Sequence, residues 1–318
     1  MKCVLVGNYG VGNIGDEALK EYFLSKFPDI SWSIVSAHPT AAHDIPRLPL
    51  GVRSLFAPWW KTINAIRHAD ALIFGGGSLF TDIESVWACV IWRTYAILAS
   101  WFKVPVMLAF QGAGPWKTGL GLRLAKKTYQ SAAFISVRDE DSLRRLEAFH
   151  LAHPPTLSFD PAFAFFATKP RISVSHRLVL IPRANSNEKF FEEAQKKLSE
   201  NFSDVHILLM QPDDIERRVG KRLKAICTVP ALVIELTSVQ HLLDEVSAAS
   251  EVLSQRFHGT LAAFAMGIPA RSVPQHAGDK MDTLNERMND ASARTVLLTT
   301  VKTGSDALRQ AMRGVSSL

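Results

Sequence analysis

The sequence predicts an α/β fold with two consecutive halves, each a parallel sheet covered by helices. Short apolar runs alternate with segments of helical period along nearly the whole chain. Glycine-rich turns follow several of these runs, at positions 7–15, 75–77 and 111–115. A Pro-rich segment at about 152–176 separates two series of such elements.

The first half is predicted to contain five strands and five helices. Its first helix shows Leu19, Phe23 and Phe27 at helical spacing. The predicted strands are Lys2–Val6, Ser31–Ser36, Ala71–Phe74, Val104–Phe110 and Phe134–Val137. The predicted helices are Asp16–Lys26, Trp59–His68, Val86–Phe102, Leu120–Ser131 and Asp141–Phe149.

The second half repeats the alternation without repeating the sequence. Its predicted strands are Leu178–Ile181, Val205–Met210, Leu232–Leu236 and Val252–Ser254. Its predicted helices are Glu188–Glu200, Glu216–Ile226, Val239–Ala249 and Gly259–Met266. We therefore expect two Rossmann-like domains, 1–165 and 172–318, that face a cleft. Ligands in such sheets bind beyond the carboxyl ends of the strands.

Composition limits the function classes. The 318 residues are 47% hydrophobic and 21% charged, as in globular proteins, and the net charge is +6. A mild positive excess suits a small anionic substrate or an acidic membrane surface, and without a dense Lys/Arg stripe it gives no indication of nucleic acid. Cys3, Cys89 and Cys227 lie far apart in apolar surroundings. They predict buried free thiols in a reducing compartment, with no disulfide and no thiolate metal site.

No targeting or spanning segment is predicted. The apolar run after Met1 is too short for a signal peptide. The segment Val86–Phe102 is the most apolar, but it has Arg93 at its centre and is shorter than the roughly 20 residues of a bilayer span. We interpret it as a buried helix, with a membrane-contacting helix as the alternative, in a soluble cytoplasmic protein.

The first glycine-rich turn predicts an anion site. Gly10, Gly12 and Gly15 form G-x-G-x-x-G before a helix, where backbone N–H groups can approach an anion. A dinucleotide site would also need an acid after the second strand, and residues 36–38 offer Ser, Ala and His, so NAD is disfavoured. Asp16 follows the turn, either as a functional acid or as a residue that caps the helix and complements its dipole.

Two further turns and one arginine extend this site. The runs 75–77 and 111–115 end strands in the same half, so we expect a shared anion-binding floor. Its predicted members are Gly12, Asn13, Gly15, Gly76, Gly77, Gln111 and Gly112. Arg138 ends the next strand and suits a phosphate or carboxylate, unless it pairs with Asp139 or Asp141.

In the second half, His258 is the main candidate. It lies where a strand meets an apolar helix, between Arg256 and Gly259, and we favour catalysis over a satisfied core histidine. Lys280 is a further candidate cation, and Arg183 ends the first strand of this half. The chain has no H-E-x-x-H, no Walker loop and no G-x-S-x-G, so zinc hydrolysis, P-loop transfer and α/β-hydrolase chemistry lack support.

Taken together, these motifs resemble the polysaccharide pyruvyl transferase family, from about residue 3 to 285. The matching strings are GNYGVGNIGDEA, FGGGSLFTD, QGAGP, SVRDEDS, the Phe159–Phe163 box and RFHGTLAAFAMGIP. Their order and spacing carry the resemblance. It implies a GT-B-like fold and transfer of the enolpyruvyl group of phosphoenolpyruvate to a sugar, closed to a pyruvate ketal. It also implies cell-wall or exopolysaccharide acceptors, often lipid-linked at the cytoplasmic membrane face.

The resemblance implies that the family's functional residues correspond to Asp16, Arg138, His258 and Lys280. The family often has Tyr and Pro before this lysine, whereas Ala277–Asp279 precede it here. We expect His258 as general acid and Asp16 as general base. We expect Arg138, Arg256 and Lys280 to bind the donor's anionic groups, assisted by helix N-termini such as that at Gly259. Neither a metal nor a cofactor beyond the donor is expected.

Two alternatives stay open at this point. One is a GT-B nucleotide-sugar glycosyltransferase, although the helix 259–266 is apolar throughout and lacks the acid that such a site would need. The other is a non-catalytic membrane adaptor with an interfacial surface, although we expect most of its tryptophans in the core. If such a surface is present, we expect it to associate an enzyme peripherally with the cytoplasmic membrane face, where it can reach a lipid-linked acceptor. That surface would contain Trp59, Trp60, Lys61, Arg67, Trp87, Trp92 and Trp101. The acceptor sugar, the ketalised hydroxyl pair, its stereochemistry and the oligomeric state are not predicted.

Overall fold

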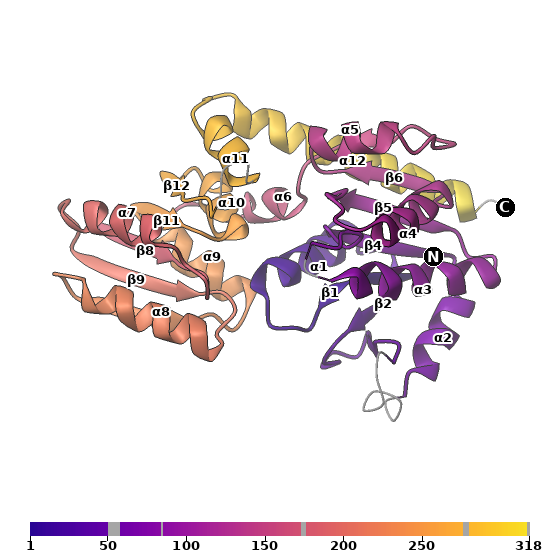
Figure 1. Cartoon of the computed structure of the whole chain (residues 1–318), viewed down its shortest axis with the longest axis horizontal. Helices are drawn as coiled ribbons and strands as arrows, with labels where there is room; N and C mark the ends of the chain where they lie inside the picture. Colours follow the sequence, from indigo (N-terminus) through magenta and orange to yellow (C-terminus); the bar gives the residue numbers. More distant parts are fainter. Residues whose placement is uncertain (50–57, 84, 173–175, 276–279, 317–318) are drawn as a thin grey trace. The chain divides into compact units, whose positions relative to one another are not determined.

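The computed structural model describes residues 1–49, 58–83, 85–172, 176–275 and 280–316, excluding the side chains of Lys280 and Ser316. Two parallel sheets organise the chain (Figure 1). The first has seven strands in the order β3-β2-β1-β4-β5-β6-β7, all parallel. They are β1 Lys2–Tyr9, β2 Ser31–Ser36, β3 Asp44–Pro46, β4 Ala71–Gly77, β5 Val106–Gln111, β6 Phe134–Val137 and β7 Thr156–Leu157.

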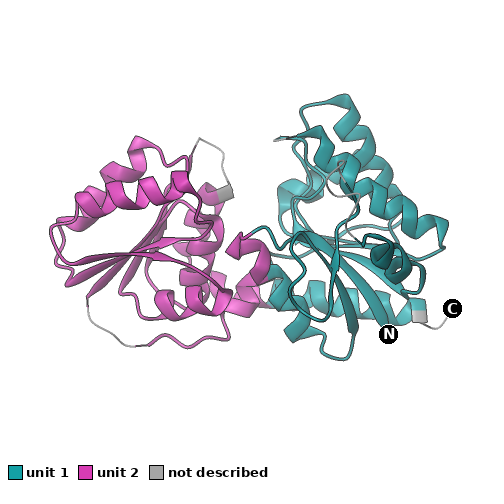
Figure 2. Cartoon of the chain, turned by 90° about the horizontal axis from the view of Figure 1, so that it is seen from below, with its two compact units in different colours: residues 1–11, 19–161, 299–318 teal, residues 12–18, 162–298 magenta. Residues whose placement is uncertain are grey.

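Helices cover both faces of this sheet. One face packs against α2 (Trp60–Arg67), α3 (Val86–Trp101), α4 (Gly119–Gln130) and α5 (Glu140–Glu147). The side chains that form this layer of the core include Ile66, Tyr95, Tyr129 and Leu146 against Val6, Leu72 and Leu108. The other face carries α1 (Ile14–Lys26) and α12 (Ala293–Ser316), joined by a hydrogen bond between the Tyr22 and Ser305 hydroxyls. Figure 2 shows the teal sheet between these layers.

The second sheet has five parallel strands in the order β10-β9-β8-β11-β12. They are β8 Arg177–Ile181, β9 Asp204–Leu209, β10 Ala231–Glu235, β11 Glu251–Ser254 and β12 Ala270–Ser272. The helices are α6 Ala162–Phe166, α7 Glu188–Leu198, α8 Asp214–Ala225, α9 Val239–Ser247, α10 Phe257–Ala265 and α11 Lys280–Met288. Phe190 of α7 and Leu223 of α8 close one core layer over Leu180 and Ile207.

The chain forms two compact units, and neither is a single continuous stretch (Figure 2). Unit 1 contains residues 1–11, 19–161 and 299–318, and unit 2 contains 12–18 and 162–298. Both α1 and α12 therefore begin in unit 2 and continue in unit 1. This division differs from the contiguous ranges 1–165 and 172–318, because the later part of α12 packs on the first sheet. Those ranges stay a prediction about independent domains.

The packing of α12 involves side chains that the sequence analysis did not consider. The Ser158 hydroxyl donates to the Thr300 carbonyl at 3.2 Å. The Arg309 guanidinium pairs with Asp29 at 2.9 Å and lies over the Phe27 ring. These contacts attach the second part of α12 to unit 1.

The predicted strands and helices are present, with ends that shift by a few residues. The prediction missed β3, β7, β12, α6, α11 and α12. Strands of two or three residues are too short to display a period of two, and α6 lies in a Phe-rich run directly after Pro161.

Two predictions about burial were wrong in part. All three cysteines are free, and Cys3 and Cys89 are buried, but Cys227 is only half-buried, with its thiol donating to the Leu223 carbonyl at 3.3 Å. Most of the tryptophans considered for the surface lie outside the core. Trp60, Trp87 and Trp101 are exposed and Trp59 is half-buried, whereas Trp92 is buried. Across the described residues, no helix combines the length and the apolar character needed to cross a bilayer.

Asp82 fixes the start of α4. Its carboxylate accepts hydrogen bonds from the backbone N–H groups of Lys117 (2.6 Å) and Thr118 (2.8 Å) and from the Thr118 hydroxyl (2.5 Å). Burial alone would raise the pKa of Asp82, but these hydrogen bonds outweigh it and lower the pKa below its ordinary value. A side chain at Gly121 would overlap the carboxylate.

We predict that Asp82→Asn destabilises the fold by about 1–3 kcal/mol at pH 7. Because the folded state lowers the pKa of Asp82, its carboxylate stabilises the fold above the ordinary Asp pKa of about 3.9, and this contribution is lost as pH falls through the folded-state value. The difference in the free energy of unfolding between the parent and Asp82→Asn, measured by urea unfolding, should be smaller at pH 3 than at pH 7. Asp141→Asn, at an exposed acid, is the control. An equal effect at both pH values would contradict this role.

Candidate functional site

The residues selected from the sequence fall into two groups, one in each unit. Unit 2 contains Gly12, Asn13, Gly15, Asp16, Arg256, His258, Gly259 and Lys280. Unit 1 contains Gly76, Gly77, Gln111, Gly112 and Arg138.

Asn13, rather than Asp16, caps α1. The Asn13 side-chain oxygen accepts the N–H of Gly15 at 3.1 Å, and its amide donates to the Asp16 carboxylate at 2.9 Å. The Asn13 carbonyl accepts the N–H groups of Asp16 and Glu17, both at 3.1 Å. The capping alternative for Asp16 was therefore wrong. Asp16 lies in the first turn, where the helix dipole favours an acid, and Asn13 orients its carboxylate.

The imidazole of His258 lies directly against Gly15. A Cβ atom built on Gly15 would overlap the His258 Nδ1 atom, so this position has no room for a side chain. His258 is in the first turn of α10, which follows β11, and its Nε2 atom is shielded from solvent. Gly15 immediately precedes Asp16, so the packing brings the imidazole to the segment that carries the carboxylate.

Gly12 is a glycine for a different reason. Its φ is +78°, in the left-handed region that favours glycine, and a Cβ there would meet nothing within 4 Å. The first turn thus contains one glycine needed for backbone conformation and one needed for the approach of an imidazole.

Arg256 forms an ion pair with a buried acid that the sequence analysis missed. Its guanidinium donates to Glu216 in the first turn of α8 and to the Gln211 side chain at 3.4 Å. Glu216 is fully buried, and its other oxygen accepts the N–H of Gln211 at 2.8 Å. Burial raises the pKa of Glu216, and the charge of Arg256 opposes that rise. The pair holds the residues before α10, and substrate binding by Arg256 stays a prediction.

Gly259 has a packing role. A Cβ there would come within 2.7 Å of the Ile181 side chain and 2.8 Å of the Ser254 hydroxyl. Its N–H donates to the Arg256 carbonyl at 3.1 Å, so this amide is already engaged within the chain. Lys280 begins α11, and its side chain lies outside the described part, as do residues 277–279.

In unit 1, Arg138 lies at the end of β6 in a polar, buried setting. Its guanidinium donates to the Ser78 hydroxyl at 2.9 Å and to the Asp160 carboxylate at 3.3 Å, and it lies 3.6 Å from Asp139. Arg138 is 8% exposed and Asp160 is fully buried. The sequence had suggested Asp139 or Asp141 as partners, and Asp141 pairs with Arg144 instead. Asp160 was missed, although it stands inside the 159–163 box.

The turns after β4 and β5 meet beside Arg138. The Gly112 N–H donates to the Gly77 carbonyl at 2.8 Å. A Cβ on Gly112 would overlap the Ser78 hydroxyl and lie 3.0 Å from the Arg138 guanidinium, so the glycine admits the arginine. Two of the three turns expected to form one floor therefore come together in unit 1, whereas the turn at 12–15 belongs to unit 2.

Gln111 connects neighbouring strands. Its side-chain amide donates to the carbonyls of Phe74 and Ala109, both at 3.0 Å, and the residue is fully buried. These hydrogen bonds give Gln111 a structural role at the end of β5. Its predicted part in substrate binding stays a prediction.

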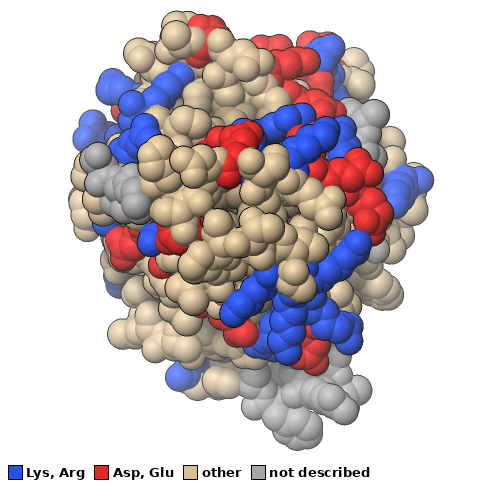
Figure 3. Space-filling view, turned by 90° about the vertical axis from the view of Figure 1, so that its left-hand side faces the viewer, with Lys and Arg blue, Asp and Glu red and all other residues tan. Residues whose placement is uncertain are grey.

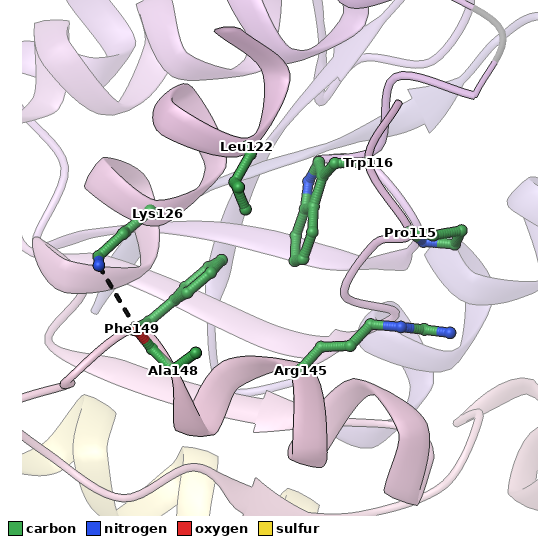
Figure 4. A pocket seen from close by; sticks show the side chains of 7 residues that line it. All are labelled: Pro115, Trp116, Leu122, Lys126, Arg145, Ala148 and Phe149. Atoms are coloured by element: carbon green, nitrogen blue, oxygen red, sulfur yellow. Dashed lines mark hydrogen bonds between the residues drawn. The ribbon is translucent and has the colours of Figure 1, made fainter. Parts of the chain in front are cut away.

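A hollow of about 380 Å³ lies beside the third turn (Figure 4). It is lined by Pro115, Trp116, Leu122, Lys126, Arg145, Ala148 and Phe149. The Trp116 and Phe149 rings are 5.3 Å apart, and the Trp116 N–H donates to the Phe80 carbonyl at 2.7 Å. Of its lining, the sequence had singled out only Pro115. The described residues contain no group of three or more His, Cys, Asp or Glu side chains that could hold a metal ion.

Solved structures with a similar fold, all of low sequence identity, include a complex with UDP and glucose and two UDP-GlcNAc 2-epimerases. HepE from Anabaena, in complex with UDP and glucose, has a TM-score of 0.56 and 11% identity, with all of both chains covered. UDP-GlcNAc 2-epimerase from Neisseria meningitidis has a TM-score of 0.59 and 12% identity, covering 99% of this chain and 100% of that one. UDP-GlcNAc 2-epimerase from Methanocaldococcus jannaschii has a TM-score of 0.60 and 13% identity, covering 97% of this chain and 99% of that one. These similarities confirm the predicted α/β, GT-B-like fold.

No curated protein matches the chain significantly. A family model described as polysaccharide pyruvyl transferase matches residues 13–276, which is most of the sequence and includes Asp16, Arg138 and His258. This match favours a pyruvyl transferase over the glycosyltransferase alternative. The chain belongs to the polysaccharide pyruvyl transferase family.

Proposed function

We propose that the protein transfers the enolpyruvyl group of phosphoenolpyruvate to a sugar of a cell-surface polysaccharide precursor and closes it to a pyruvate ketal. The observation that carries the proposal is the packing of His258 on Gly15, next to Asp16. This packing brings an imidazole to the segment that carries a carboxylate, and we propose the first as general acid and the second as general base. Family membership supports the transferase class.

In the first step, Asp16 takes the proton from a sugar hydroxyl while its oxygen attacks the central carbon of phosphoenolpyruvate. His258 gives a proton to the methylene carbon, which becomes the methyl group. In the second step, a neighbouring hydroxyl of the same sugar attacks the same carbon and gives its proton to His258, which restores the acid. The proton held by Asp16 passes to the departing phosphate. The bond to the phosphate oxygen breaks, and inorganic phosphate leaves with the electron pair.

The donor's phosphate and carboxylate need cationic partners. Arg138 is suited to this role because Ser78 and Asp160 already fix its guanidinium plane, so little conformational entropy remains to be lost on binding. We propose Lys280 as a second cation. No metal or cofactor is part of the proposal.

We propose a cytoplasmic location and a sugar acceptor that is attached to a lipid in cell-wall or exopolysaccharide synthesis. The glycosyltransferase alternative rests on the structural neighbours, whose bound molecules include UDP, glucose and UDP-GlcNAc. An assay that compares phosphoenolpyruvate with UDP-sugars as donors therefore distinguishes pyruvyl transfer from glycosyl transfer.

We predict that the protein, given phosphoenolpyruvate and a panel of hexosides, releases phosphate and adds to one hexoside the mass of pyruvate less water. His258→Ala and Asp16→Asn should lower the turnover number at least about 100-fold, because each removes one proton-transfer group. Mass spectrometry and phosphate release measure both effects.

His241→Ala, at a histidine of α9 that pairs with Glu245, is the matched control and should retain turnover. Thermal stabilisation by UDP but not by phosphoenolpyruvate, with hexose transfer from UDP-sugars, would favour the glycosyltransferase. Near-normal turnover of His258→Ala would remove the imidazole from the mechanism.

We predict that Gly15→Ala lowers both thermal stability and turnover, because the new Cβ displaces the imidazole of His258. The double variant Gly15→Ala/His258→Ala should regain stability but not turnover, since the overlapping ring is gone. Gly119→Ala, where a Cβ meets nothing within 4 Å, is the control. Additive losses of stability in the double variant would show that the two positions do not interact.

We predict that Arg138→Ala destabilises the fold by about 3–5 kcal/mol, because it leaves the buried Asp160 carboxylate without its ion pair. Adding Asp160→Asn should restore much of that stability. Pyruvyl transfer should stay lost in both variants if Arg138 binds the donor. Denaturant unfolding and the phosphate assay separate the two effects, and recovery of turnover in the double variant would assign Arg138 a purely structural role.

A further inference from the structure

The outer side of α3 carries exposed large apolar side chains at both of its ends and no acidic residue. Trp87, Val90, Thr94, Ile97 and Trp101 recur every three or four residues on the side of the helix that faces away from the sheet, and we refer to them as the α3 stripe. Trp87 is 67% exposed and Trp101 74%. A solvent-facing helix surface normally carries charged residues, so this stripe needs another explanation.

The neighbouring helices extend the apolar surface. α2 and α4 cover the same face of the first sheet as α3, and α3 packs on both of them. Trp60 of α2 and Leu120 of α4 are 60% and 52% exposed. The outer surface of α2, α3 and α4 therefore presents large apolar side chains from three adjacent helices, and we call it the helical face.

The charged residues of the three helices that form the helical face are all basic. The three helices carry six Lys and Arg residues and no Asp or Glu; the six are Lys61, Arg67, Arg93, Arg123, Lys126 and Lys127. The chain has 36 Lys and Arg residues and 30 Asp and Glu residues, which gives its net charge of +6. The six basic residues of these helices therefore equal the whole excess, and the rest of the chain has as many basic as acidic residues.

Another part of the surface shows the usual mixture. In the view of Figure 3, Lys and Arg lie beside Asp and Glu. On α8 of unit 2, Arg217 pairs with Glu235 at 2.7 Å and Arg222 with Glu188 at 2.9 Å. The helical face differs from such a surface because its own helices supply cations without acids.

An anionic bilayer fits this combination. Trp side chains favour the boundary between water and lipid, and cations without acids are attracted to anionic headgroups. A second copy of the chain fits poorly, because a symmetric contact would bring together two sets of helices that carry cations and no acids. No described helix is suited to crossing the bilayer, so the contact would be peripheral.

We propose that unit 1 docks on an anionic lipid bilayer through the helical face, with the α3 stripe at the headgroup boundary and the cations around it. The proposal goes beyond the pyruvyl transfer reaction and depends only on the surface of unit 1. It would keep the enzyme at a membrane that holds a lipid-linked acceptor.

The test uses the full chain and sedimentation with vesicles of phosphatidylcholine, with or without phosphatidylglycerol. We expect binding to the anionic vesicles, weakened by salt. Trp87→Ser/Trp101→Ser and Arg123→Gln/Lys127→Gln should each lower the affinity about tenfold or more, and the second should also reduce the salt dependence. Circular dichroism confirms that each variant is folded.

The matched controls lie on α8. Ile215→Ser removes an apolar side chain that is 50% exposed, and Lys221→Gln/Lys224→Gln removes two exposed cations; both variants should bind as the parent does. Failure of the parent protein to sediment with anionic vesicles would overturn the proposal. So would equal binding by all variants, or a dimer without vesicle binding that dissociates when Trp87 and Trp101 are replaced. None of these results depends on catalytic activity.

Discussion

The contact between the His258 imidazole and the backbone of Gly15 links the first turn of α1 to the first turn of α10. Residues 12–18 lie early in the sequence, yet they pack with unit 2, and the Ile14 N–H donates to the Met210 carbonyl at 3.3 Å. Without a Cβ at Gly15, the ring can lie against the main chain. The geometry of the proposed acid and base therefore requires glycine at position 15, because the Cβ atom of any other residue would overlap the imidazole.

The polar side chains around the candidate residues are held by buried partners. Asp160 holds Arg138, and Glu216 holds Arg256. Burying a carboxylate without a cationic partner costs several kcal/mol of folding free energy. Each arginine is therefore held in place by the ion pair with its buried acid. In such a site the orientation of a guanidinium is set before any ligand binds. This preorganisation lowers the entropy lost on binding.

The sequence predicted the fold better than it predicted the partners of the site residues. Alternating strands and helices of ordinary length are visible in the pattern of apolar residues, which is why the elements from β4 to β6 were found. Asp160 and Glu216 were missed because a pairing over 22 or 40 residues leaves no local period. The role of Gly15 was likewise hidden, since a glycine needed for close approach and one needed for a positive φ look alike in sequence. The surroundings of most of the tryptophans considered for the surface were misjudged for a similar reason: an apolar helix does not reveal which of its sides lacks a neighbour.

The discontinuity of the two units has a consequence for biosynthesis. The ribosome makes residues 19–161 before residues 299–316 of α12, which belong to the packing layer on their α1 side. That layer stays incomplete until all of unit 2 has been translated. Apolar groups such as Phe27, which the Arg309 side chain covers in the finished protein, are meanwhile less shielded from other nascent chains and from chaperones.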